Sequence, residues 1–191
     1  SNVRRAGILM PISALPSPYG IGTLGAAARE FVDFLASAGQ SCWQMLPVCP
    51  TSFGDSPYQS FSSYAGNPYF IDLEDLAAEG LLRAEEFRDL DWGEDPRRVD
   101  YGRLYTIRYP VLRKACDRLL AAEPPEFLRF CEEHRDWLED YALFMALKER
   151  HGGGVSGSAA ARRWTPPGRS WRGRPLFGGR RSICSSASGK R

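Results

Sequence analysis

Two short apolar runs near the N-terminus predict β-strands. Gly7–Met10 ends at Pro11, and Cys42–Leu46 ends at Pro47. Apolar runs of four or five residues that stop at a proline are typical of buried strands. We therefore expect a buried strand at each of these two places.

The residues between the two runs carry a helical pattern. It predicts a helix that begins after Thr23, as its N-cap, and ends at Gly39. The apolar face of this helix consists of Leu24, Ala28, Phe31, Leu35 and Ala38. A strand, a helix and a strand in this order predict parallel strands joined by a right-handed crossover. The long loops after the two strands then lie at the sheet edge where parallel α/β folds build their sites.

Helical patterns dominate the second half of the chain. The expected helical segments are Leu73–Leu82, Glu85–Leu90, Val99–Leu120, Glu126–His134 and Asp136–Arg150. We expect the third segment to be interrupted near Pro110, because proline removes a helical hydrogen bond. In the last segment, one face carries Trp137, Tyr141, Phe144 and Met145. That spacing indicates a core stripe rather than a cofactor site.

The most unusual stretch is Pro47–Glu74, which has neither helical nor strand periodicity. Small polar residues alternate there with the rings of Phe53, Tyr58, Phe61, Tyr64, Tyr69 and Phe70. Flat rings beside short hydrogen-bonding groups suit a pyranose, which has a C–H face and a rim of hydroxyls. An ordered loop packed by its own aromatic side chains would have the same composition. Composition alone leaves both interpretations open.

Three glycines in the first loop imitate a dinucleotide-binding motif. Gly20, Gly22 and Gly25 spell G-x-G-x-x-G before the first expected helix. The dinucleotide fingerprint requires these glycines immediately after the strand, where the pyrophosphate meets the helix N-terminus. A proline-rich segment intervenes here, and no acidic residue follows at the right place. We therefore do not expect a dinucleotide site.

The length and the charge distribution limit the possible folds and partners. A chain of 191 residues, 43% of them hydrophobic, can bury a core, but a complete (β/α)₈ barrel typically needs about 250 residues. No apolar run approaches the roughly 20 residues of a membrane span, and no export signal is recognisable. The overall charge of +2 hides a split, because residues 1–150 carry 16 basic and 23 acidic groups. The chain therefore reads as an acidic globular part followed by a basic tail.

Cysteine spacing gives no sign of a metal centre. The five cysteines (Cys42, Cys49, Cys116, Cys131 and Cys184) match no zinc or redox pattern. Free thiols in a reducing cytosol are the simplest explanation. Cys131 and His134 share one helix face, but no second pair accompanies them. We expect neither a metal nor another cofactor.

Residues 152–191 lose the regular patterning of the rest of the chain. This segment is rich in Gly, Arg, Ser and Pro and contains no acidic residue. A nucleic-acid-binding arm with Trp164 and Trp171 as stacking groups would have such a composition. A disordered tail would also have it, as would a GC-rich coding stretch translated out of frame. The acidic body argues against nucleic acid as a partner. We favour the out-of-frame interpretation because the family resemblance described next stops abruptly at His151-Gly-Gly.

Four stretches closely resemble the amylomaltase family, also called 4-α-glucanotransferase or disproportionating enzyme. They read GILMPISALPSPYGIGTLG, CWQMLPVCPTSFGDSPYQSFSSYAGNPYFIDLEDL, VDYGRLY and WLEDYALFMALKERHGG. Together they cover most of residues 7–153. The segment GDSPYQSFSSYAGNP is long and unusual, so chance similarity is not a serious explanation.

This resemblance implies an α/β fold, the N-terminal portion of a TIM barrel with a mostly helical insertion. Residues 1–72 would begin the barrel, residues 73–151 would form the insertion, and residues 152–191 would be an irregular tail. The resemblance also implies a cytoplasmic protein that acts on α-1,4-glucans and maltooligosaccharides. Such enzymes transfer glucan segments by a retaining double displacement, which needs two carboxylates about 5–5.5 Å apart.

The family's catalytic carboxylates lie downstream of everything matched here. None of Asp55, Asp72, Glu74 or Asp140 occupies a family catalytic position, so we name no catalytic residue. The resemblance instead implies a binding role. Tyr58 matches the tyrosine that lies against the sugar next to the cleavage point.

The same resemblance implies further substrate-binding residues. Asp55, Ser56, Gln59 and Ser60 would shape the pocket around Tyr58 by hydrogen bonds. Phe53 and Tyr105 match two aromatic residues that form a second glucan-binding groove in some members. We expect Asn67-Pro68 to shape a turn and Trp43 to belong to the core.

Three functional hypotheses follow. The chain is a portion of a 4-α-glucanotransferase that lacks the catalytic carboxylates, a non-catalytic α-glucan-binding module, or a protein that binds nucleic acid through its basic tail. We favour the first, and expect the chain alone to be inactive.

Overall fold

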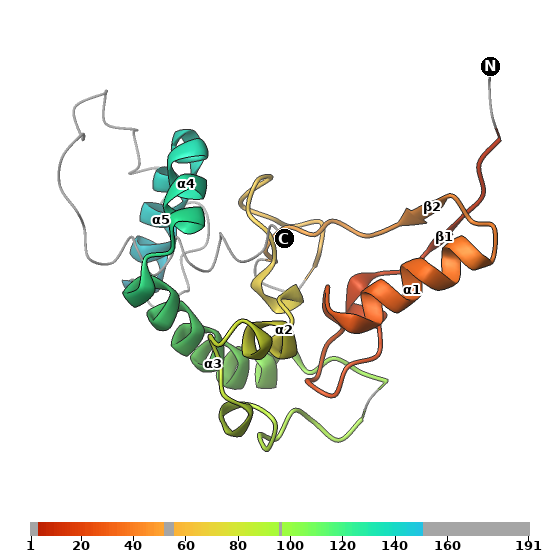
Figure 1. The fold of residues 1–191 in the computed structure, drawn as a ribbon, viewed down its shortest axis with the longest axis horizontal. Coiled ribbons are helices and arrows are strands. Elements are labelled where there is room, and N and C mark those ends of the chain that lie inside the picture. The colour runs from red at the N-terminus through yellow and green to blue at the C-terminus, as the bar shows by residue number, and fades with distance from the viewer. Residues whose placement is uncertain (1–3, 52–55, 96, 151–191) are drawn as a thin grey trace.

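A computed structural model describes residues 4–51, 56–95 and 97–150, so the tail at 152–191 lies outside the described residues. Two strands, β1 (Gly7–Leu9) and β2 (Cys42–Gln44), flank α1 (Ala26–Ser37), and the short helices α2 (Leu73–Ala78) and η3 (Ala84–Glu86) follow the long loop. The last three helices are α3 (Tyr101–Ala122), α4 (Pro125–Glu133) and α5 (Arg135–Arg150). Single 3₁₀ turns lie at Ile12–Ala14 (η1) and Pro68–Phe70 (η2). The strands and α1 lie at one end of an elongated arrangement, α4 and α5 lie at the other, and α2 and α3 lie between them (Figure 1).

The sheet confirms the predicted topology but not the predicted burial. β1 and β2 pair in parallel, with Ile8 opposite Trp43. Both strands are largely exposed, and Leu9 retains 56% of its accessible surface. The prediction of buried strands was wrong because, in the described part of the chain, this sheet has only two strands. A parallel sheet becomes buried when helices cover both of its faces.

Trp43 lies between the sheet and α1, where it is half-buried. Its ring packs edge-on against Phe31 of α1 at 5.1 Å, and its Nε1–H donates to the Met10 carbonyl at 2.8 Å. Together with Ile12, Leu15 and Ala28, these residues form the smaller of two apolar clusters. The assignment of Trp43 to packing rather than to a ligand contact agrees with these contacts.

The first predicted helix is confirmed, but its predicted cap is wrong. α1 begins after Gly25, and the Thr23 hydroxyl donates instead to Asp72 Oδ2 at 2.5 Å. The helix ends as predicted, with Gly39 in the left-handed region at φ 70°. On its inner face, Ala28 and Leu35 are buried. Thr23 therefore joins two distant segments rather than ending one helix.

The helix α3 runs without interruption through Pro110, so the predicted break was wrong. Asp100 caps its N-terminus by accepting a hydrogen bond from the Arg103 N–H at 3.0 Å. Leu104 and Val111 are buried on either side of the proline. A proline inside a helix costs about 3 kcal/mol, and burial on both sides of it offsets that cost.

The main core lies where the first loop, α2 and α3 meet. Phe87, Leu73 and Leu104 are its most deeply buried apolar members, each with at most 1% of its surface exposed. Tyr19 lies edge-on to both Phe87 and Trp92, at 5.2 and 5.7 Å. This core joins a segment near residue 20 to helices that begin after residues 72 and 100.

The last two helices match their predicted positions, but the predicted core stripe has a different partner. Leu138 and Ala142 are buried, whereas the stripe residues Trp137, Tyr141, Phe144 and Met145 are only half-buried. Three of these rings contact Phe61 and Tyr64 in the loop that follows β2. None of the helices in the described ranges combines the length and the hydrophobicity that a bilayer crossing requires.

Candidate functional site

A small cleft lies where the loops after β1 and β2 meet, at the carboxyl ends of the two parallel strands. It encloses about 140 Å³. Its walls include Pro11–Ser13 from the first loop, Leu46, Pro47, Thr51 and Pro57 from the second, and Tyr101 from the start of α3. This is the sheet edge at which parallel α/β folds usually bind ligands. Pro57 belongs to the SPYQS segment at residues 56–60, so this segment reaches the cleft at Pro57.

Among the described residues of the loop, Tyr58 is the most exposed large hydrophobic side chain, with 73% of its surface accessible. Its N–H donates to Ser56 Oγ at 3.4 Å, and the Gln59 N–H donates to the Ser56 carbonyl at 3.1 Å. The Ser60 hydroxyl donates to the Ser62 carbonyl at 2.8 Å. Serine side chains therefore fold this segment into successive turns and leave the Tyr58 ring directed away from the core.

The structure locates three of the remaining predicted site residues, and their binding role stays a prediction. Gln59 and Ser60 are exposed beside Tyr58, and Ser56 is half-buried. Asp55 lies outside the described residues, so its place in the pocket stays a prediction.

The predicted second groove rests on Tyr105 and Phe53. Tyr105 projects from α3 with 64% of its surface exposed, and its ring lies edge-on to Tyr109 at 5.4 Å. Tyr109 in turn meets Tyr69 of η2 at 5.5 Å, so Tyr105 is the exposed end of a series of ring contacts between α3 and η2. Phe53 lies outside the described residues, and the pairing of the two rings stays a prediction.

Asn67 shapes the end of the loop, as expected for the Asn-Pro pair. Its side-chain oxygen accepts the Tyr69 N–H at 3.0 Å, and its own N–H donates to the Val48 carbonyl at 2.8 Å. Only 5% of the Asn67 surface is exposed. These bonds close the loop by tying its end to its beginning.

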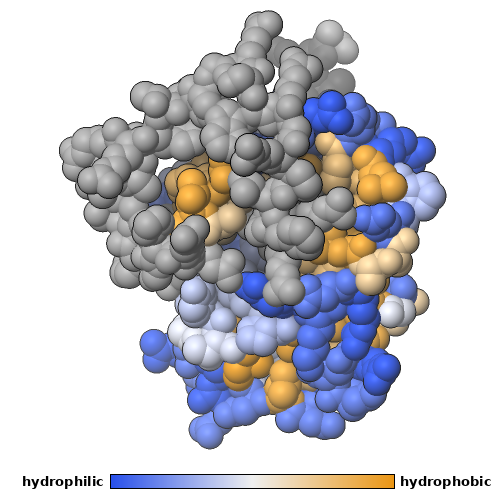
Figure 2. Space-filling view, turned by 90° about the vertical axis from the view of Figure 1, so that its left-hand side faces the viewer, coloured by the Kyte–Doolittle hydropathy of each residue, from blue (hydrophilic) through white to orange (hydrophobic). Residues whose placement is uncertain are grey.

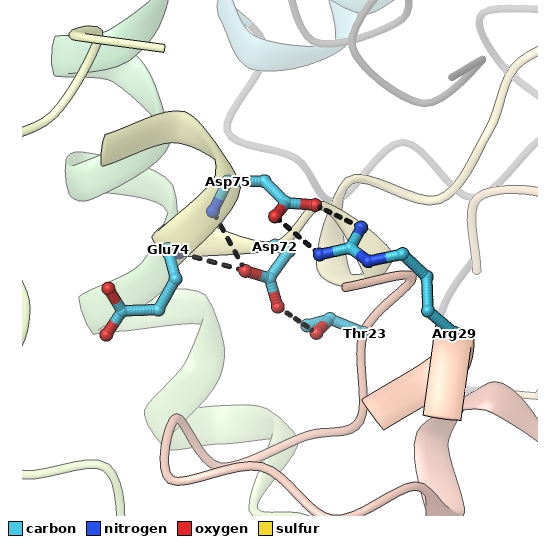
Figure 3. A network of polar contacts seen from close by, with 5 residues as sticks. All are labelled: Thr23, Arg29, Asp72, Glu74 and Asp75. Carbon is cyan, nitrogen blue, oxygen red and sulfur yellow. Dashed lines mark hydrogen bonds and ion pairs between the residues drawn. The ribbon is translucent and has the colours of Figure 1, made fainter. Parts of the chain in front are cut away.

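A polar network of Thr23, Arg29 and the acidic residues at the start of α2 joins three segments of the chain (Figure 3). Asp72 Oδ1 accepts the N–H groups of Glu74 and Asp75 at 2.9 and 3.0 Å, which caps α2. Arg29 of α1 reaches Asp75 with two hydrogen bonds of 2.9 and 3.0 Å. The arginine lowers the pKa of Asp75. A carboxylate in this state is an ion-pair partner and not a proton donor.

Glu74 is held in the same way by a different arginine. Arg88 donates to both of its carboxylate oxygens, at 2.7 and 3.1 Å, and the Tyr19 hydroxyl donates to it as well. The hydrogen bond from Arg88 lowers the pKa of Glu74. Burial, followed by the contact with Glu74, raises the pKa of Tyr19 to about 12. Neither group is available for proton transfer near neutral pH.

Among the described carboxyl groups, Glu86 has the most strongly lowered pKa. Arg118 donates to its two oxygens at 2.6 and 2.8 Å, and the Arg83 N–H donates to it at 2.9 Å. These bonds lower the pKa of Glu86 to about 2. Each of the described carboxyl groups with a resolved shift is lowered: Glu74, Asp75, Glu86 and Asp95.

Arg108 is fully buried and binds two segments to α3. Its Nη1 donates to the Tyr19 carbonyl at 3.3 Å and its Nη2 to the Ile71 carbonyl at 2.5 Å. Burial lowers its pKa to about 10, and the charge of Asp72 opposes that change. Arg108 therefore fixes the distance between the first loop and the end of the second.

None of the resolved carboxyl shifts is in the direction that the acid of a glycosidic bond cleavage needs. A catalytic acid for that reaction needs a carboxyl pKa raised toward neutrality. The resolved carboxyl shifts go in the opposite direction, and arginines occupy the oxygens. The described residues also hold no group of three or more side chains suited to bind a metal ion. The described site therefore consists of exposed aromatic rings and hydroxyl groups next to the ion-paired carboxylates.

Sequence reasoning did not single out Arg108 or Tyr64. An arginine at the 108 position interrupts the apolar helical spacing of Leu104, Val111 and Ala115, and that pattern was a signal of a buried charge. Tyr64 was recognised only as one of six loop aromatics. Its distinguishing contact is with Trp137, 73 residues later, which no local pattern reveals.

Comparisons with known proteins agree on one family. The model of the family described as 4-alpha-glucanotransferase matches residues 10–173, which includes part of the tail. A 4-alpha-glucanotransferase from Thermus thermophilus is 51% identical over 154 residues, covering 78% of this chain and 30% of the relative. One from Streptococcus pneumoniae is 48% identical over 147 residues, covering 76% and 29%.

A solved structure gives the same result. Amylomaltase from Streptococcus agalactiae, in complex with acarbose, superposes with a TM-score of 0.82 at 37% identity. The superposition covers 97% of this chain and 39% of that one. The chain thus spans about 30% of the length of the curated relatives named above.

Proposed function

The chain belongs to the 4-alpha-glucanotransferase family, and from that premise we propose that it binds α-1,4-glucans through the loop after β2 without cleaving them. The ligand class comes from the family, one solved member of which, from Streptococcus agalactiae, holds acarbose. The proposed place is the cleft at the strand ends and the adjoining segment 56–60, whose Pro57 lines the cleft.

We further propose that the chain is the N-terminal portion of such a glucanotransferase. Residues 1–72 would begin a (β/α)₈ barrel and residues 73–151 would form a helical insertion. The parallel pair β1 and β2, joined by α1, supports a barrel start, and the helices after residue 72 support the insertion. The exposed faces of both strands also fit a sheet that continues in a complete enzyme.

One observation carries the binding proposal: the Tyr58 ring is exposed beside short hydrogen-bonding groups. A pyranose stacks its C–H face on such a ring, and neighbouring amides and hydroxyls pair with its hydroxyl groups. Gln59 and Ser60 supply those groups here. A loop packed on its own aromatics would instead bury Tyr58, which is 73% exposed.

The absence of cleavage follows from the carboxylates. A retaining transfer needs a nucleophilic carboxylate and a second one as acid and base. We propose that both belong to parts of the family's enzymes beyond this chain. In support, Asp72, Glu74 and Asp75 are engaged in a helix cap or in arginine pairs.

Calorimetric titration with maltotriose and maltoheptaose tests the binding proposal. We expect weak binding that Tyr58→Ala abolishes and Tyr58→Phe retains, because the ring face carries the contact. Phe34→Ala is the matched control, since Phe34 is also an exposed ring, 60% accessible, but lies on α1. Unchanged affinity in Tyr58→Ala would remove Tyr58 from the site, and absence of binding by the unmodified chain would contradict the proposal.

A further inference from the structure

We propose that Tyr64, supported from behind by Trp137, is a second stacking platform that binds a more distant part of a long α-glucan chain. This inference rests on the proposed function, because it takes the ligand class from there. It adds a residue outside the predicted pocket and a preference for ligand length.

The Tyr64 ring is exposed and fixed at the same time. It keeps 63% of its surface accessible, yet it stacks on Trp137 of α5 with centroids 5.6 Å apart and planes inclined by 20°. Its backbone is held as well, because Ser62 Oγ accepts the N–H groups of Tyr64 and Ala65 at 3.2 and 3.0 Å. An exposed ring that is already ordered loses little conformational entropy when a ligand binds.

Phe61, in the same loop, is also held against α5. Phe61 lies parallel to Tyr141 at 6.5 Å and meets Phe144 at 5.7 Å, and Lys148 Nζ stands 4.1 Å above the Phe61 ring centre. Phe61 and Tyr64 therefore anchor the second half of the loop on α5. Figure 2 views the molecule from the α4 and α5 side, where hydrophobic patches reach the surface among hydrophilic residues.

The chemistry of the platform matches that of Tyr58. Both are tyrosines in one loop, and both have an exposed ring on a backbone that a serine side chain holds: Ser56 Oγ accepts the Tyr58 N–H and Ser62 Oγ accepts the Tyr64 N–H. Six residues separate them, which limits their Cα distance to about 20 Å at full extension. A short oligosaccharide occupies one ring, whereas a longer one reaches both.

Two linked contacts produce a length preference. Once Tyr58 holds one end of a glucan, the second contact is intramolecular and has a high effective concentration. A single aromatic stacking contact corresponds to roughly a threefold to tenfold change in affinity. We therefore expect maltoheptaose to bind more tightly than maltotriose, by about that factor.

The test is calorimetry of the full 191-residue chain with both sugars. We expect Tyr64→Ala to weaken maltoheptaose binding by about fivefold and to leave maltotriose binding within twofold. Tyr64→Phe should preserve both affinities, because the ring and not the hydroxyl makes the contact. Phe34→Ala is the matched control, since Phe34 is an exposed ring stacked on Phe31, and it should change neither affinity.

The outcomes separate this inference from the proposed function. The inference would be overturned if Tyr64→Ala weakened the binding of both sugars equally or of neither. In either case, a loss of binding in Tyr58→Ala would still support the proposed function. Failure of the unmodified chain to bind either sugar would overturn both.

Circular dichroism of Tyr64→Ala checks the fold, and Trp137→Phe provides a second measurement. The Trp137→Phe variant keeps a ring behind Tyr64, so it should still bind maltoheptaose more tightly than maltotriose. Because it lacks the Trp137 indole, it should lose most of the change in tryptophan fluorescence that accompanies maltoheptaose binding.

Discussion

The loop at residues 56–66 and a cluster of charged residues, which we call the polar hub, present different chemical groups. The loop presents the exposed rings of Tyr58 and Tyr64 and several hydroxyl groups, and it contains no carboxylate. The hub, which we define as Asp72, Glu74, Asp75 and Arg108 with their partners, contains carboxylates whose oxygens are occupied. Under the proposed function, the loop recognises a sugar and the hub holds the chain in place.

This division has a physical origin. A carboxylate bound by two arginine N–H groups is stabilised in its charged form, so it neither donates a proton nor attacks a sugar carbon readily. An exposed tyrosine has no such commitment and can stack on a ligand. Substitutions in the hub should therefore change stability, and substitutions in the loop should change binding.

The largest expected effect comes from Arg108→Met in the hub. The substitution leaves the carbonyls of Tyr19 and Ile71 without their buried donor, which should lower the free energy of unfolding by about 3 kcal/mol. Urea denaturation measures this change. Arg97→Met is the control, because the Arg97 side chain is 88% exposed and its loss should cost less than about 0.5 kcal/mol. Equal effects of the two substitutions would contradict the assignment of Arg108 to the hub.

A smaller loss is expected for Asp72→Ala. This variant removes the cap of α2 and the partner of Thr23, and should cost about 2 kcal/mol of unfolding free energy. Thr23→Val removes only the hydroxyl contact and should cost about 1 kcal/mol. If Thr23→Val proved as damaging as Asp72→Ala, the capping role of Asp72 would be wrong.

The next effect depends on pH and concerns Glu86. Its pKa is about 2 in the folded chain and 4.5 ordinarily, so the folded state binds fewer protons than the unfolded state between these values. The stability that Glu86 contributes is thus fully present above about pH 4.5 and is lost as the pH falls toward 2. Glu86→Gln should flatten the pH dependence of the melting temperature in this range. Glu94→Gln, at an exposed position, should leave that dependence unchanged.

The smallest effect on stability is expected in the loop. Tyr58→Ala should change the free energy of unfolding by less than about 0.5 kcal/mol, because the ring is 73% exposed. The same variant should lose maltooligosaccharide binding. A large loss of stability would show that Tyr58 is part of the packing and would remove the contrast between the two regions.

Local sequence patterns predicted the parts of the fold that depend on neighbouring residues. The parallel strands, the end of α1 at Gly39 and the positions of α4 and α5 follow from apolar spacing and helix stop signals. Burial of the strands was not predictable, because it depends on what covers the sheet. The uninterrupted α3 was missed because Leu104 and Val111 hold both sides of Pro110 through contacts made far away in the chain.

The candidate site shows the same limit. Tyr58 and its serine and glutamine neighbours could be named from the SPYQS segment and the family it resembles. The Thr23 contact with Asp72 spans 49 residues and the Tyr64 contact with Trp137 spans 73, so neither leaves a local signature. The aromatic composition of the loop left a sugar surface and a self-packed loop equally open, and the fold separates its exposed rings from its anchoring ones.

The central claim is that this chain binds glucans without cleaving them, and incubation of the purified 191-residue chain with maltotriose tests it most directly. Glucose release is measured over time, with the Thermus thermophilus 4-alpha-glucanotransferase as the positive control. We predict that the relative releases glucose and longer maltooligosaccharides while this chain releases none. Glucose release that increases in proportion to the amount of this chain would contradict the claim.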